Sequence, residues 1–157
     1  MLRPAIAFLL PLGLAACGSA TAQQQETPYW ATVDTTELNL RVGPSTEYRI
    51  EWVYRRKGLP LKVLRVKDDG WRFVEDHEGA TGWVNKNLLS PDRGGLVTGD
   101  DPAPMRTAPS DSAALKWTLA PGVVGELGEC EAGWCSFRVD QREGFVPAGR
   151  LWGAGEP

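Results

Sequence analysis

The sequence predicts an all-β protein with two small barrels in tandem behind an N-terminal signal segment. Three observations lead to this fold class. Glycine and proline make up about a fifth of the chain, with 18 Gly and 12 Pro among 157 residues, against an average of about 12%, so helices cannot run far. Apolar residues alternate with the period of two that is typical of strands. Finally, several landmarks recur in the same order in both halves of the chain, which indicates a repeated fold.

The first 22 residues have the features of a signal segment. Arg3 precedes an uncharged stretch from Ala5 to Ala16, which is shorter than the roughly 20 residues that a membrane-spanning helix needs. Leu14-Ala15-Ala16-Cys17 resembles the lipobox of bacterial lipoproteins, which predicts a lipid on Cys17. Ala20-Thr21-Ala22 has the form of an ordinary secretory site, and cleavage after Ala22 would discard Cys17. We favour the lipobox because the apolar run ends directly on it, but both alternatives stay open. Either one predicts export to the periplasm or to the periplasmic face of the membrane.

The strands follow from alternation and from turn residues. Residues 45–57 contain neither Gly nor Pro, and their apolar side chains alternate at Tyr48, Ile50, Trp52 and Tyr54. Leu115, Trp117 and Leu119 alternate in the same way. The other predicted strands of the first half are Leu38–Leu40, Leu61–Val66 with a bulge after Val63, Trp71–Val74 and Thr81–Val84, the last two joined by a hairpin loop at His77-Glu78-Gly79.

An internal repeat fixes the domain organisation. Leu40–Ser45 matches Met105–Ser110 at an offset of 65, and Gly70-Trp71 matches Gly133-Trp134 at 63. Gly82-Trp83-Val84 then matches Gly144-Phe145-Val146 at 62. An offset that falls in small steps is the result expected from loop shortening between two copies of one fold. We therefore expect a first barrel at 30–90, a linker at 91–102 and a second barrel at 103–153.

The repeated landmarks resemble a known family. Leu40-Arg41-Val42-Gly43-Pro44, followed by Gly70-Trp71 and Gly82-Trp83-Val84, resembles the signature of bacterial SH3-like (SH3b) domains. Residues 52–61 are similar to one subgroup, the tandem SH3-like proteins of proteobacterial envelopes. The resemblance covers about residues 30–153 and implies two SH3-like barrels, with a 3₁₀ turn at Asn85-Lys86-Asn87 before the last strand of the first. The second copy departs from the pattern, with Ala108 for the turn glycine and Phe145 for the tryptophan.

Composition and motifs disfavour several classes of function. The chain has 17 basic and 20 acidic residues and a formal charge of −3, whereas nucleic-acid binding needs a strong excess of Lys and Arg. His77 is the only histidine, and it lies in a predicted hairpin loop. The adjacent acids Asp68-Asp69 and Asp100-Asp101 lie in turn-forming sequence, unlike a carboxylate pair that flanks a cleft. We therefore expect no enzyme, no cofactor and no metal site.

Cys130 and Cys135 are the two cysteines outside the signal segment. Two cysteines cannot complete a four-ligand zinc site, and in an oxidising compartment an even pair is typical of a disulfide. We predict that they pair across a turn between two antiparallel strands and stabilise the second barrel.

The resemblance implies a binding role at the cell wall, with peptidoglycan or its stem peptides as the ligand. Seven basic residues lie between Arg49 and Lys67 against the single acid Glu51, which favours an anionic partner, although a solvated surface explains them equally well. The candidate contact residues of the first repeat are Arg41, Tyr54, Arg55, Arg56 and Trp83. One alternative is an assembly or adaptor role with another envelope protein, and a third is regulation of a separate cell-wall hydrolase. We expect membrane contact only through the lipid anchor.

Overall fold

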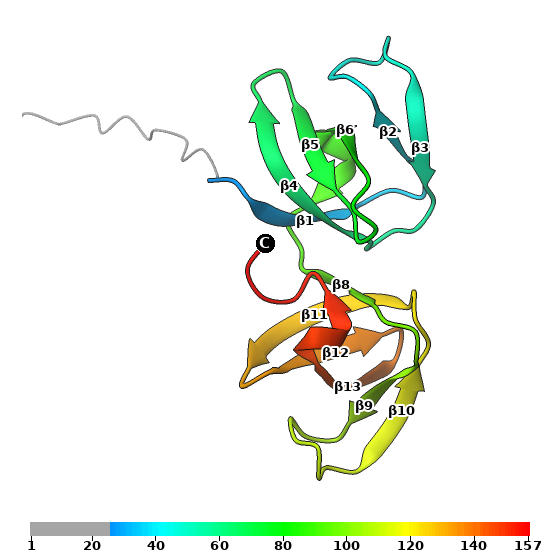
Figure 1. Ribbon diagram of the computed structural model, residues 1–157, viewed down its shortest axis with the longest axis vertical. Coiled ribbons are helices and arrows are strands. Elements are labelled where there is room, and N and C mark those ends of the chain that lie inside the picture. Colours follow the sequence, from blue (N-terminus) through cyan, green and yellow to red (C-terminus); the bar gives the residue numbers. More distant parts are fainter. Residues whose placement is uncertain (1–25) are drawn as a thin grey trace, which may run out of the picture.

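The computed structural model describes residues 26–157, so Cys17, Ala22 and the rest of the signal segment lie outside the described part of the chain. The described chain is all-β, as predicted, and forms two seven-stranded sheets that close into two small barrels (Figure 1). In residues 26–157 no helix is long and apolar enough to cross a bilayer.

Each barrel has the same arrangement of strands. The first consists of β1 (Tyr29–Val33), β2 (Leu38–Arg41), β3 (Ile50–Tyr54), β4 (Pro60–Lys67), β5 (Trp71–Glu75), β6 (Thr81–Asn85) and β7 (Leu89–Ser90). The second consists of β8 (Gly94–Val97), β9 (Ala103–Arg106), β10 (Leu115–Leu119), β11 (Val124–Glu131), β12 (Trp134–Val139), β13 (Arg142–Pro147) and β14 (Leu151–Trp152). The strand orders, β3-β2-β6-β5-β4-β1-β7 and β10-β9-β13-β12-β11-β8-β14, correspond position by position. The internal repeat is thus a repeat of structure.

Local details of the first barrel also follow the sequence. Leu61 and Val63 on β4 and Val84 on β6 are fully buried, in line with the alternation of the two strands. The predicted bulge is confirmed by a register shift between Val63 and Arg65 where β4 pairs with β5. A 3₁₀ helix, η1 (Lys86–Leu88), precedes β7, and the side chain of Asn85 caps it by accepting from the Asn87 amide at 2.9 Å.

The prediction of a linker at 91–102 is wrong. β8 lies inside that segment, is buried at all four positions and pairs with both β11 and β14. The sequence did not indicate this strand, because Gly94 and Gly95 leave only two apolar residues, which are too few for an alternating pattern. The second barrel therefore begins at Gly94, and only Pro91 to Arg93 join the two barrels.

The two barrels share apolar contacts. Leu96 of β8 belongs to the core cluster of the first barrel, and Val124 and Trp152 of the second barrel pack against the same cluster. The Trp152 indole donates a hydrogen bond to the carbonyl of Pro60 at 3.2 Å. Its ring also meets Trp30 edge to face, with centroids 5.1 Å apart. The contact is therefore part of the folded core.

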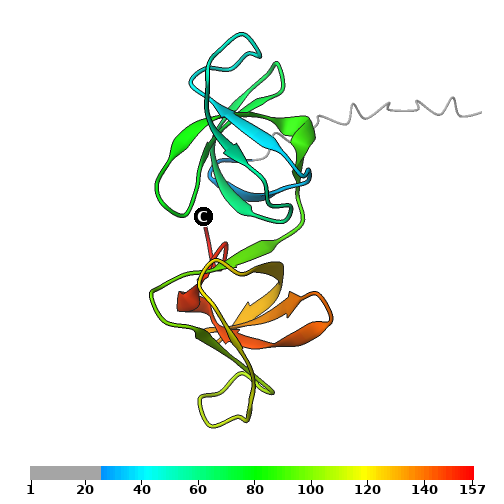
Figure 2. The ribbon, with the colours of Figure 1, turned by 90° about the vertical axis from the view of Figure 1, so that its right-hand side faces the viewer.

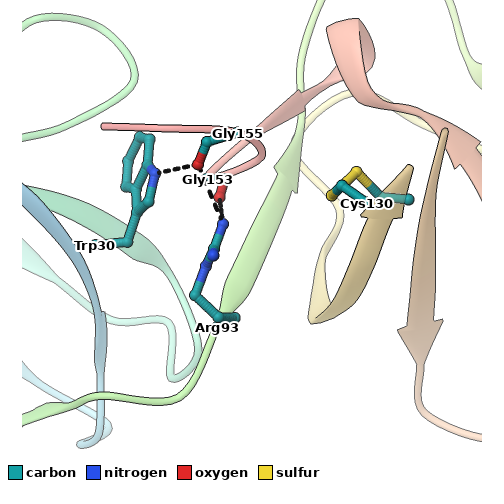
Figure 3. The surroundings of a disulfide bond; sticks show 6 residues. Trp30, Arg93, Cys130, Gly153 and Gly155 are labelled. Carbon is teal, nitrogen blue, oxygen red and sulfur yellow. Dashed lines mark hydrogen bonds between the residues drawn. A yellow bond between two sulfur atoms is a disulfide. The ribbon is translucent and has the colours of Figure 1, made fainter. Parts of the chain in front are cut away.

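The C-terminal segment lies between the barrels and closes this contact (Figures 1 and 2). Figure 3 shows Trp30 of the first barrel and Arg93 of the connection pointing at its carbonyl groups. Trp30 donates to Gly155 at 3.1 Å, and Arg93 donates to Gly153 at 2.7 Å. At the centre of the contact a Cβ on Gly94 would lie 2.4 Å from the carbonyl oxygen of Gly58, so only glycine lets the two backbones approach this closely.

We expect Trp152→Ala to lower the free energy of unfolding by about 2–4 kcal/mol, because it removes a large ring from the core contact and a hydrogen bond to Pro60. Since the ring packs on the first barrel, the change should weaken both barrels together. Denaturant unfolding followed by circular dichroism measures this loss.

Trp117→Ala is the matched control, because Trp117 is 42% exposed on the edge strand β10 and contacts neither Trp30 nor Pro60. Its cost should stay below about 1 kcal/mol. An unchanged midpoint for Trp152→Ala would mean that the barrels are independent.

Candidate functional site

Most of the basic stretch 49–67 is neutralised within the chain. Five of its cations contact carboxylates: Arg49–Glu51 at 3.9 Å, Arg55–Glu37 at 3.3 Å, Lys57–Asp34 at 2.9 Å, Lys62–Glu75 at 3.4 Å, and Lys67–Asp69. Arg56 instead donates to the carbonyl of Gly122 in the second barrel. Arg65 alone in this stretch has neither an ion pair nor a side-chain hydrogen bond to any residue from 26 to 157. Among the described residues, Arg56 and Arg65 thus lack a carboxylate partner, and Arg65 also lacks a hydrogen-bond acceptor.

Arg65 lies over two aromatic rings. The register pairs Arg65 of β4 with Phe73 of β5, and Phe73 with Trp83 of β6, so the three side chains lie side by side on the outer surface of the first barrel. The guanidinium carbon is 4.1 Å from the Phe73 centroid and 5.6 Å from the Trp83 centroid. The rings are 5.3 Å apart and tilted by 58°. We call Arg65, Phe73 and Trp83 the arginine–aromatic face; cation–π attraction holds the cation in place there.

Arg41 lies next to Trp83 of this face, but its guanidinium holds a loop in place. It pairs with Trp83 across β2 and β6, and its guanidinium donates to the carbonyls of Thr46 at 2.9 Å and Tyr48 at 2.6 Å. The equivalent Arg106 of the second barrel donates to Ala113 at 2.8 Å in the same way. Arg41 is thus a positioning residue that fixes the loop beside the face.

The expectation that Tyr54 contributes to a contact surface is corrected by its position. The residue is 6% exposed and belongs to the core cluster. Its hydroxyl donates to the buried carboxylate of Asp76 at 2.7 Å, and Asp76 also accepts from the amides of Glu78 and Ala80. Burial, together with this hydrogen bond, raises the pKa of Tyr54 above its usual range. Tyr54 therefore anchors the hairpin loop that carries His77.

The remaining candidates lie apart from the face. Arg55 and Arg56 are exposed after the end of β3 and are held by Glu37 and Gly122. Of the five residues proposed from the sequence, only Trp83 belongs to the arginine–aromatic face, and Arg41 lies beside it. Sequence reasoning missed Arg65 and Phe73. The alternation of β4 and β5 could have identified these two residues, because it places both of them on the outer surface once the bulge in β4 is taken into account.

The second barrel carries different residues at the equivalent positions. β4 and β11 both span eight residues, 60–67 and 124–131, so Arg65 corresponds to Glu129. By the repeat offsets, Ser136 on β12 replaces Phe73 and Phe145 on β13 replaces Trp83. Ser136 and Phe145 are paired across their strands just as Phe73 and Trp83 are. The second barrel thus keeps the geometry and reverses the charge.

The predicted disulfide is confirmed. Cys130 and Cys135 are direct partners of β11 and β12 and form a bond across the hairpin, with Cα atoms 4.0 Å apart. Cys135 is fully buried, and Cys130 is exposed. Figure 3 shows the bond on the strands of the second barrel, to one side of Trp30 and Arg93. The pair closes the hairpin and leaves no free thiol in residues 26–157.

The other polar candidates form no centre. His77 and the acids Asp68, Asp69, Asp100 and Asp101 are exposed in loops. Within residues 26–157 there is no group of three or more His, Cys, Asp or Glu that could hold a metal ion. A hollow of about 710 Å³ opens between the barrels and is lined by side chains of both charges. Two ion pairs in its wall, Lys57–Asp34 and Arg138–Glu126, already satisfy part of that charge.

Comparison with known proteins agrees with this architecture. The family model described as bacterial SH3 domain matches twice, at residues 34–91 and 99–153. The chain belongs to the bacterial SH3 domain family. Each match covers one barrel except for its first strand, β1 or β8. Membership favours a binding role associated with the cell wall.

No curated protein matches the chain. Among solved structures, the chain is similar to NlpC2 from Trichomonas vaginalis, with 12% identity and a TM-score of 0.36 over 82% of this chain and 49% of that one. NlpC1 from the same organism shows 14% identity and a TM-score of 0.35, over 88% of this chain and 50% of that one. The chain therefore spans about half the length of these structures, and scores of this size do not establish a common arrangement.

Tyr54→Phe should destabilise the first barrel by about 1–3 kcal/mol at neutral pH, because the buried Asp76 carboxylate loses a donor. The pKa of Tyr54 is raised in the folded protein relative to the value near 10 of an unfolded chain. Its stabilising contribution is therefore complete below about pH 10 and decreases as the pH rises further. The stability difference between the two proteins should narrow above about pH 10, as measured by urea unfolding at a series of pH values.

The corresponding position in the second barrel, Leu119, has no hydroxyl, so Leu119→Val serves as a core control whose cost does not change with pH. A stability difference between the native protein and Tyr54→Phe that stays constant from pH 7 to 11 would contradict the raised pKa of the buried Tyr54 hydroxyl.

Proposed function

We propose that this protein is a non-catalytic cell-envelope module that binds peptidoglycan, or its stem peptides, through the arginine–aromatic face. The observation that carries the proposal is the unpaired Arg65 over Phe73 and Trp83. Neighbouring aromatic rings suit the apolar faces of sugars and peptides, and an unpaired guanidinium suits the carboxylates of wall peptides.

The positions of the polar groups support binding over catalysis. His77 lies on an exposed loop whose Glu78 amide donates a hydrogen bond to Asp76. Cys130 and Cys135 form a disulfide with each other. A nucleophilic centre needs a base held against its nucleophile, and these groups are instead engaged in holding hairpins. Binding is therefore the activity that fits where they lie.

A second candidate function is assembly with another envelope protein. The observation in its favour is a pair of exposed apolar residues on the edge strand of each barrel, Ile50 and Trp52 on β3 and Leu115 and Trp117 on β10. Trp52 and Leu115 are 59% and 57% exposed. Because these patches occur in both repeats and the arginine–aromatic face in only one, the two functions predict different sensitive residues.

Sedimentation with purified sacculi tests wall binding. We expect the protein to sediment at physiological salt, and Trp83→Ala to weaken binding about fivefold, because loss of an aromatic contact costs on the order of 1 kcal/mol. Phe145→Ala, at the equivalent position of the second barrel, is the matched control and should leave sedimentation unchanged.

Arg55→Ala combined with Arg56→Ala should also sediment normally, because both cations are already engaged within the chain. A protein that stays in the supernatant would exclude wall binding. Loss of sedimentation in Trp52→Ala, with Trp83→Ala unaffected, would favour the edge strands instead.

We further propose that the protein is exported and held at the periplasmic face of the membrane by a lipid on Cys17, a residue that lies outside the described part of the chain. The support is the lipobox at Leu14–Cys17. Radiolabelled palmitate should be incorporated into the native protein and not into Cys17→Ser. Equal labelling of the two would exclude Cys17, and export of an unlabelled protein cleaved after Ala22 would establish a soluble periplasmic form.

A further inference from the structure

The charge of Arg65 is available to a ligand, whereas the charges around it are not. The two cations that flank it on β4 are paired, Lys62 with Glu75 and Lys67 with Asp69. The carboxylates nearest along the strands are therefore occupied, and Arg65 is left as the cation that an incoming anion meets. Arg65 itself is exposed.

The rings beneath Arg65 decide which anion fits. A guanidinium carries five N–H donors in one plane, and it can stack on an aromatic ring while its edge remains free for hydrogen bonds. In residues 26–157 no acceptor takes a hydrogen bond from Arg65, so this edge is unused, while Phe73 holds the group at 4.1 Å. A carboxylate matches two parallel N–H donors, and it is the anion that a peptide supplies in the proposed wall-binding function.

The rest of the face selects the group that bears the carboxylate. Phe73 and Trp83 form a continuous, partly exposed aromatic surface next to the guanidinium. A small apolar residue at the end of a peptide can lay its methyl group on these rings while its terminal carboxylate meets Arg65. A charged residue gains nothing from the rings, because all polar donors of the face lie at the guanidinium end.

We propose that Arg65, Phe73 and Trp83 form a binding site for the terminal carboxylate of a short peptide that ends in a small apolar residue. This inference rests on the proposed wall-binding function and names the group that is recognised.

The equivalent surface of the second barrel lacks the groups that would form such a site. Glu129 takes the place of Arg65 and repels a carboxylate, and Ser136 removes the ring on which a cation would rest. The two other cations of β4 are replaced as well, Lys62 by Glu126 and Lys67 by Glu131. The equivalent surface of the second barrel is therefore unsuited to the same ligand.

The test uses N-acetyl-D-alanyl-D-alanine as the probe and the indole N–H resonance of Trp83 in a ¹⁵N-labelled protein as the readout. We expect a saturable shift of this resonance with the free acid, and at least tenfold weaker binding of the same dipeptide as its C-terminal amide. Arg65→Gln should abolish the shift. Arg65→Lys keeps the charge but loses the paired donors, so it should bind about tenfold more weakly than the native protein.

Arg142→Gln is the matched control. Arg142 also lies over a tryptophan, 4.9 Å from the Trp117 centroid in the second barrel, but it has no second ring beside it of the kind that Trp83 provides. The Trp83 shift should be unchanged in this variant. Equal binding of acid and amide, or full binding by a folded Arg65→Gln protein, overturns the carboxylate site.

The two proposals fail in different ways. If sacculi bind the protein and Arg65→Gln does not change it, wall binding stands and the carboxylate site is wrong. If the free acid shifts Trp83 but sacculi do not bind, the site stands, wall binding is wrong, and the carboxylate belongs to the C-terminus of a protein partner.

Discussion

The packing of Trp152 and Leu96 on the first barrel is the contact on which the rest of the molecule depends. A barrel of about 60 residues buries only a modest fraction of its surface and is marginally stable by itself. Here Leu96 completes the core of the neighbouring barrel, and Trp152 covers it while donating to Pro60. The carbonyls of the last residues then accept from Trp30 and Arg93. The second barrel thus adds residues to the core of the first while keeping a core of its own, and this contact joins the two barrels.

Within this shared frame the two copies have kept the groups that shape the barrel and changed those that face solvent. Arg41 and Arg106 brace equivalent loops, and Gly58 and Gly122 adopt the same positive φ, 82° and 83°. In contrast, the three cations of β4 correspond to three glutamates of β11. The buried pair of Tyr54 and Asp76 is likewise confined to the first copy, since Leu119 stands where Tyr54 would be. Divergence of the outer surface without loss of the fold is what a division of roles between the copies requires.

Alternation and repeat offsets were sufficient to predict both barrels and the bulge after Val63, and the cysteine count with the expected export predicted the disulfide. Each of these features depends on neighbours along the chain or on one turn. β8 was missed because two glycines leave it almost no pattern. The site was harder to predict. Arg55 is neutralised by Glu37, because the pairing of β2 and β3 brings the two residues close together. Counting charged residues in the sequence cannot predict this ion pair. Phe73 and Arg65 meet only through the register of β4 and β5, so sequence identified Trp83, which lies in a motif, and not its two partners.

A single small site has a consequence for affinity. One carboxylate and one methyl group bury little area, so the intrinsic affinity of the arginine–aromatic face for a free peptide is expected to be weak, in the millimolar range. In the proposed arrangement the protein is tethered to a membrane that lies next to the wall, and the wall presents many copies of the ligand. Tethering raises the effective concentration of ligand to the millimolar range or above, so a weak site is occupied for much of the time and still releases quickly. A joined pair of barrels with the proposed binding face, held by the proposed lipid anchor, therefore suits reversible attachment better than permanent attachment.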